Sequence, residues 1–297
     1  MTLVFKKKQS FTVNSSVLLN AISKIEFARY EFTLHTIKHL TEVLRANVIT
    51  GLSFSGDYFG VGTVFRDFGT LFDDLHCNTT LKKLCFDELI GIRSPIALNS
   101  FLEYIKNTKT LVNLRIVKQG FDIVDTLFPV CISHNSSIRK LKLSQLNFST
   151  EDYNTIFGIN SQLNLSKCEL VDMDLTADDL RVIGNYIDRN SVSSLILDRN
   201  LLYPDDDITT FLESVAHSKL LKFSMRHSFR TVHVRKAQNV LKKNISLTYI
   251  GLYSKYAQHS TSFDCFDHIA RCNYIRQISL FDLLISTHFE IAGELQN

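Results

Sequence analysis

The chain has 297 residues, 45% of them hydrophobic, and its 33 lysine and arginine residues nearly balance its 30 aspartate and glutamate residues. A chain of this length and hydrophobic content can bury a sizeable core, and its small net charge excludes a polybasic nucleic-acid or membrane-surface binder. Glycine and proline number only 11 and 3, which argues against long disordered linkers.

No segment has the run of about 18 apolar residues that a membrane span needs, and the first residues lack the apolar stretch of a signal peptide. The six cysteines form no CxxC pair and lie mostly among apolar neighbours. This distribution is typical of reduced core thiols. We therefore expect a soluble cytoplasmic protein with no membrane partner.

An internal repeat organises the chain. Residues 192–202, VSSLILDRNLL, have the form L-x-x-L-x-L-x-x-N-x-L. The same frame recurs along the sequence with a mean step of about 28 residues, and each copy predicts a short strand. The first positions of the frames are Ile22, Ile49, Leu81, Leu111, Ile138, Asn160, Val192, Leu220, Leu247 and Ile275.

Segments with helical periodicity separate these strands. The predicted helices span about 33–46, 65–77, 95–107, 122–134, 231–243, 261–272 and 284–295, with two more after Thr176–Asp179 and Asp205–Asp207. Pro129 predicts a kink in its helix. The frame at Asn160 leaves only 22 residues after Ile138, which is room for one or two turns.

An asparagine precedes most frames, as at Asn47, Asn78, Asn135 and Asn244. Asparagine tolerates the left-handed backbone that ends a helix, so each of these residues predicts a helix C-terminus. This role gives a structural reason for the glycosylation sequons that begin at Asn78, Asn135 and Asn244.

A strand followed by a helix cannot bury its apolar face alone, so we expect stacked copies in an α/β leucine-rich-repeat solenoid of about ten repeats. The repeat resembles the ribonuclease-inhibitor class, which implies a horseshoe with a concave parallel β-sheet and convex helices. The resemblance covers residues 22–282 of a single domain, 1–297. Residues 1–21 would form an N-terminal cap and residues 283–297 a C-terminal capping helix.

The resemblance implies a non-enzymatic module that binds a partner protein on its concave face, as an inhibitor or regulator, and is a monomer when free. The bias towards Asn, Ile, Lys and Phe resembles leucine-rich-repeat effectors that intracellular bacterial pathogens secrete into the host cytosol. That likeness implies a host protein or another effector as partner. A GTPase activator of the Ran-activator type and a ubiquitin-ligase adaptor stay open as alternatives.

Strand alternation sends positions three, five and seven of each frame to the concave surface. The frame at Asn160 contributes Gln162, Asn164 and Ser166. Seven basic and three acidic side chains give this surface a charge of +4, which predicts an acidic patch on the partner. The predicted partner-binding residues are Lys83, Arg115, Lys140, Lys142, Lys222, Arg226, Tyr249, Tyr253 and Phe281. The three aromatics are typical interface anchors, unless the C-terminal cap folds over them.

Other chemistry has weaker support. His35 and His39 could share a metal but lack a third ligand, and Cys265, His268 and Cys272 match no common zinc spacing. Asp172, Asp174, Asp178 and Asp179 lack the pattern of a calcium loop. No phosphate loop, nucleophile elbow or HExxH motif is present, so we expect no catalysis, metal, cofactor or nucleic-acid partner.

Overall fold

The computed structural model describes fourteen stretches of the chain. They are residues 1–6, 22–28, 30, 32, 34–55, 68–87, 95–117, 127–200, 202, 207–226, 236–237, 240, 243–253 and 277–278.

A parallel sheet runs through the whole described structure. Its eleven strands pair in chain order, and every pair is parallel. The strands are β1 (Thr2–Lys6), β2 (Lys24–Ala28), β3 (Gly51–Ser55), β4 (Lys83–Asp87), β5 (Asn113–Val117), β6 (Lys140–Ser144), β7 (Lys167–Val171), β8 (Ser194–Ile196), β9 (Lys222–Arg226), β10 (Tyr249–Tyr253) and β11 (Gln277–Ile278).

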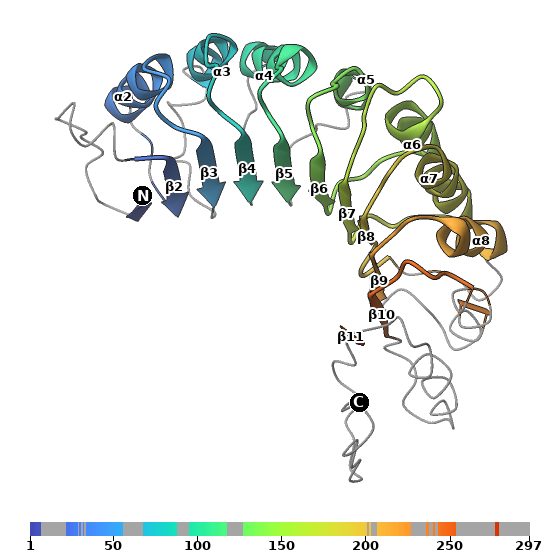
Figure 1. Cartoon of the computed structure of the whole chain (residues 1–297). Helices are drawn as coiled ribbons and strands as arrows, with labels where there is room; N and C mark the ends of the chain where they lie inside the picture. The colour runs from blue at the N-terminus through green and yellow to red at the C-terminus, as the bar shows by residue number, and fades with distance from the viewer. Residues whose placement is uncertain are drawn as a thin grey trace, which may run out of the picture.

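Helices connect the successive strands from β2 to β9 and form the outer layer of an open arc (Figure 1). They are α2 (Leu34–Arg45), α3 (Phe68–His76), α4 (Pro95–Asn107), α5 (Leu127–Ser133), α6 (Thr150–Phe157), α7 (Ala177–Arg189) and α8 (Thr209–His217). The sheet lines the inner side of the arc (Figure 1). The expectation of a leucine-rich-repeat solenoid with a concave sheet and convex helices is confirmed.

The core lies between the sheet and the helices. The second and fourth residues of the five-residue strands β2 to β7 and β9 are buried in it, and Phe27, Phe54 and Phe86 are each no more than 2% exposed. Their rings stack in a row, with centroids 5.7 Å apart from Phe27 to Phe54 and 5.3 Å apart from Phe54 to Phe86. Stacked rings at these separations stabilise neighbouring repeats beyond the burial of their area.

The recurrent asparagines act through their side chains rather than their backbone. Of Asn47, Asn78, Asn135 and Asn244, only Asn47 has a positive φ, of 53°. Asn78 instead donates to the carbonyl of Leu44 in the preceding repeat and accepts from the backbone N–H of its own repeat. Asn135 and Asn244 repeat this pattern. The left-handed backbone predicted for these residues is therefore wrong outside Asn47, because the buried amide links adjacent repeats.

The predicted register of the seventh strand is also wrong. The frame at Asn160 used Leu163 and Leu165 as core positions of a strand, but β7 lies at Lys167–Val171. Both leucines are buried in the connection before β7, where the hydroxyl of Tyr186 donates to the Leu163 carbonyl and accepts from the Leu165 N–H. Burial of this connection made it match the apolar pattern of a strand.

The corrected register makes the repeat more regular. The first residues of β6, β7 and β8 are equally spaced along the chain, and the short convex segment predicted before β7 is helix α6. Ser149 and Asp152 form a capping box at its start, like the Thr176–Asp179 box of α7 that the sequence predicted.

Two further points concern single elements. The N-terminal cap contains a strand, β1, which pairs with β2. Pro129 is the third described residue of α5, and because the residues before Leu127 lie outside the description, the kink stays a prediction. The predicted helices at 261–272 and 284–295, and most of 231–243, lie outside the described residues.

Candidate functional site

The concave face consists of the first, third and fifth residues of each strand. From β2 to β10, together with Asp198 just after β8, it carries eight basic and four acidic side chains, a net charge of +4. The basic residues are Lys24, Lys83, Arg115, Lys140, Lys142, Lys167, Lys222 and Arg226, and the acidic ones are Glu26, Asp87, Glu169 and Asp198. The whole chain has a net charge of +3, so positive charge is concentrated on this face.

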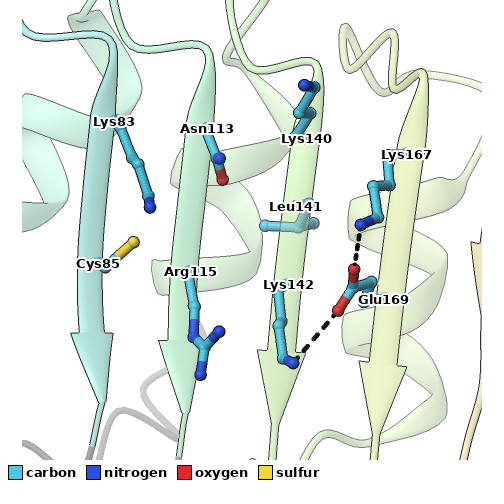
Figure 2. A pocket seen from close by; sticks show the side chains of 9 residues that line it. All are labelled: Lys83, Cys85, Asn113, Arg115, Lys140, Leu141, Lys142, Lys167 and Glu169. Atoms are coloured by element: carbon cyan, nitrogen blue, oxygen red, sulfur yellow. Dashed lines mark ion pairs between the residues drawn. The ribbon is translucent and has the colours of Figure 1, made fainter. Parts of the chain in front are cut away.

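A shallow hollow of about 160 Å³ lies on this face between β4 and β7. Its lining residues are Lys83, Cys85, Asn113, Arg115, Lys140, Leu141, Lys142, Lys167 and Glu169 (Figure 2). Four of the predicted partner-binding residues, Lys83, Arg115, Lys140 and Lys142, therefore lie together, on three adjacent strands.

Lys167 and Glu169 belong to this site but were missed by the sequence prediction, because of the error in the β7 register. The missed signal was the series Leu165, Cys168 and Leu170, which fits the apolar frame one repeat after Ile138. Gln162, Asn164 and Ser166, which were predicted for the concave face, precede β7.

Glu169 bridges two lysines on adjacent strands. Its carboxylate lies 3.2 Å from Lys142 Nζ on β6 and 2.5 Å from Lys167 Nζ on β7 (Figure 2). Burial alone would raise the pKa of Glu169, but the hydrogen bond from Lys167 and the charge of Lys142 outweigh it and hold the pKa below its ordinary value. Glu169 is therefore a built-in anion that occupies part of the basic surface.

The two arginines of the face are engaged with neighbouring carboxylates. Arg115 Nε lies 2.6 Å from Asp87 Oδ1. Arg226 donates two hydrogen bonds to Asp198 Oδ2, from Nε at 2.9 Å and Nη2 at 2.7 Å. Asp198, which is 6% exposed, also accepts from the Ser224 hydroxyl. Arg226 and Asp198 thus join β9 to the end of β8.

Lys83 and Lys140 differ from the other cations of the hollow. Both are exposed, and neither lies within 4.0 Å of a carboxylate in the part of the chain that the structure describes. Because no internal anion neutralises them, these two ammonium groups are available to an external anion.

The aromatic end of the predicted site is described only in part. Tyr249 is half-buried, and Lys222 Nζ lies 4.4 Å from the centre of its ring, within the range of a cation–π contact. Tyr253 is the last residue of β10, and the position of its side chain lies outside the description, as does Phe281. Whether the C-terminal cap covers these aromatics stays a prediction.

Cys85 lies in the hollow but is 2% exposed. Burial raises the pKa of its thiol, which keeps the sulfur protonated at neutral pH and unsuited to nucleophilic attack. The hollow therefore offers binding groups rather than an activated nucleophile.

The candidate metal ligands have local roles. His35 and His39 face each other on α2 with their Nε2 atoms 3.0 Å apart, and His39 Nδ1 contacts Glu42. No group of three possible ligands occurs among the described residues, and Cys265, His268 and Cys272 lie outside them.

The acidic cluster before α7 also has local roles. Asp172 and Asp174 adopt positive φ angles in the connection, Asp178 pairs with Arg181, and Asp179 caps α7.

Within the described residues, no helix combines the length and the apolar character needed to cross a bilayer. No known protein family matches the chain. No curated protein matches it either.

Proposed function

We propose that the protein is a non-enzymatic binding module whose concave face docks an acidic surface of a partner protein, and that docking inhibits or regulates that partner. The observation that carries this proposal is the pair Lys83 and Lys140, which line the hollow and have no carboxylate within 4.0 Å among the described residues. Uncompensated surface lysines speed encounter with an acidic partner and select for it.

The finer assignment rests on the repeat itself. From β2 to β11 the strands begin about 28 residues apart on average, and a helix of two or more turns follows most of them. Both features support the resemblance to the ribonuclease-inhibitor class. The bias towards Asn, Ile, Lys and Phe supports an effector that acts in a host cytosol on a host protein or on another effector. A partner enzyme would be inhibited if its active-site cleft were covered by the arc.

The test is partner capture with matched charge variants. We expect the double variant K83E/K140E to lose the main partner that the wild-type protein captures from host and bacterial lysates. The control K38E/K109E makes the same change in charge at exposed lysines on α2 and after α4, away from the concave face, and should retain it.

The captured partner is then purified and its activity measured with and without the protein. Equal capture by K83E/K140E and K38E/K109E would overturn the concave-face proposal. If the partner's activity is unchanged when the partner is saturated with the protein, the proposed inhibition is overturned, but the proposed binding is not.

A further inference from the structure

Positive charge is not spread evenly over the width of the concave face. The first residues of the strands form one row across the sheet, because each is the Cα partner of the next. We call this the strand-start row; from β2 to β10 it consists of Lys24, Gly51, Lys83, Asn113, Lys140, Lys167, Ser194, Lys222 and Tyr249. It contains five lysines and no acidic residue.

The rest of the face is close to neutral. Among the third residues of the strands, Arg115 and Lys142 are balanced by Glu26 and Glu169. At the fifth position of the strands, and at Asp198 just after β8, the single basic residue Arg226 stands against two acidic residues, Asp87 and Asp198. The net charge of the concave face thus lies almost entirely at the edge where the strands begin, and Figure 2 shows Lys83, Asn113, Lys140 and Lys167 at that end of four adjacent strands.

The row is long and narrow. Neighbouring strands lie about 4.8 Å apart, so the five steps from Lys83 on β4 to Lys222 on β9 span about 24 Å. An extended peptide rises about 3.4 Å per residue, so a segment of about seven residues covers this distance. A strip one residue wide, with acidic side chains beside it, fits an extended chain better than a broad acidic surface.

The donors of the row are single ammonium groups. A lysine presents a compact point charge that one carboxylate satisfies, whereas the planar fork of arginine suits bidentate recognition of carboxylate and phosphate alike. The row contains no arginine, and the forks of Arg115 and Arg226 already contact Asp87 and Asp198. From Lys24 to Lys222 it contains no aromatic on which a nucleic-acid base could stack.

We propose that the site takes an extended acidic segment of the partner, with carboxylates at alternate residues, laid across β4 to β9 along the strand-start row. Its carboxylates pair with Lys83 and Lys140 and compete with Glu169 for Lys167, and its far end reaches Lys222. This inference rests on the proposed protein-binding function and specifies the form of the partner at that site.

A variant of Glu169 supplies a test in which the expected change is tighter binding, whereas a loss of folding would weaken binding. In the variant E169Q, Lys142 and Lys167 lose their internal counter-ion and become available to the acidic segment. We expect E169Q to bind the acidic segment about threefold or more tighter than the wild type. The two lysine ammonium groups then attract the carboxylates of the segment without competition from Glu169.

The experiment uses a fluorescent peptide of about eight residues that alternates glutamate and serine, a length matched to the row. Binding is measured by fluorescence anisotropy at an ionic strength of about 0.05 M, where surface charges are weakly screened. We expect K83E/K140E to weaken binding about tenfold or more, K38E/K109E to leave it unchanged, and E169Q to strengthen it. A lysine–serine peptide should not bind.

Three results would overturn the proposal: no binding of the acidic peptide to wild type, equal weakening by both double variants, or tighter binding of single-stranded oligothymidylate than of the peptide. The capture experiment separates this failure from failure of the proposed function. If K83E/K140E still abolishes partner capture while the peptide does not bind, the concave face remains the docking site and only the extended form of the partner is wrong.

Discussion

The side-chain amide of Asn135 donates a hydrogen bond of 2.6 Å to the carbonyl oxygen of Ile105, thirty residues earlier in the preceding repeat. Its carbonyl oxygen accepts from the backbone N–H groups of Ser137 and Ile138 at 2.8 and 2.9 Å. Asn135 is fully buried. One side chain therefore satisfies the end of one helix and the approach to the next strand at the same time.

The variant N135A should destabilise the protein by about 2–3 kcal/mol, because buried backbone groups lose their partners and cannot reach water. The control is N107A, at an exposed asparagine whose side chain donates to Glu103, and it should cost less than about 0.5 kcal/mol. Urea denaturation followed by circular dichroism measures both. Equal free energies of unfolding for the two variants would contradict the role of the buried amide.

Phe54 occupies the middle of the ring stack between Phe27 and Phe86. Replacement by alanine should lower the free energy of unfolding by about 3–5 kcal/mol, since it leaves a cavity and removes the ring from its contacts with Phe27, Phe32 and Phe86. F54L keeps most of the volume and should cost about 1.5 kcal/mol or less. The prediction fails if thermal unfolding gives both variants the same loss.

Glu169 should make stability depend on pH. Its pKa lies below the ordinary value in the folded protein, so its contribution is present above the unfolded pKa, near 4.5, and is lost as the pH falls through the folded pKa. At pH 7 we expect E169Q to be about 1 kcal/mol less stable than wild type, and this gap should close on acidification. Urea titrations across that range measure it.

The matched control for this prediction is E213Q, at an exposed glutamate of α8 without an ion pair in the described structure. Its stability should follow that of wild type at every pH. A gap between E169Q and wild type that persists well below the folded pKa of Glu169 would show that the two lysines do not act through the charge of Glu169.

The described cysteines should differ in reactivity. Cys77 is exposed, whereas Cys85, Cys131 and Cys168 are buried and have raised pKa values, because desolvation disfavours the thiolate. Brief iodoacetamide treatment of the native protein should modify Cys77 and spare the other three. Peptide mass spectrometry assigns the sites, and denaturation in urea should make all four reactive. Rapid native labelling of Cys85 would contradict the closed packing under the hollow.

The sequence predicted the fold because its physical cause is repeated. An apolar pair at the fourth and sixth frame positions, such as Leu114 and Ile116, recurs in each repeat from β2 to β9 and is buried each time once β7 has its correct register. Periodicity could not place β7, since Leu163 and Leu165 are apolar and buried without being in a strand. Only an equal spacing between frames, applied from Ile138, distinguishes the two registers.

For the site, the sequence predicted which residues share the concave face but not the contacts between them. Strand alternation placed Lys83, Arg115, Lys140 and Lys142 on one surface, and this placement is confirmed for these residues. Their pairing could not be predicted, because it depends on which strands are neighbours and in which register. The contact of Glu169 with both Lys142 and Lys167 follows from the position of β7, and the engagement of Arg226 by Asp198 follows from the end of β8.

In the described structure, each helix lies against the helices beside it and each strand pairs with the strands beside it. The units that begin at β6 and β7 are also equal in length. Excision of residues 140–166 would therefore bring β7 into the place of β6 and leave every surviving unit with a compatible neighbour. The length of the arc can therefore change by whole repeat units during evolution. The length of the ligand that its inner edge accommodates changes with it.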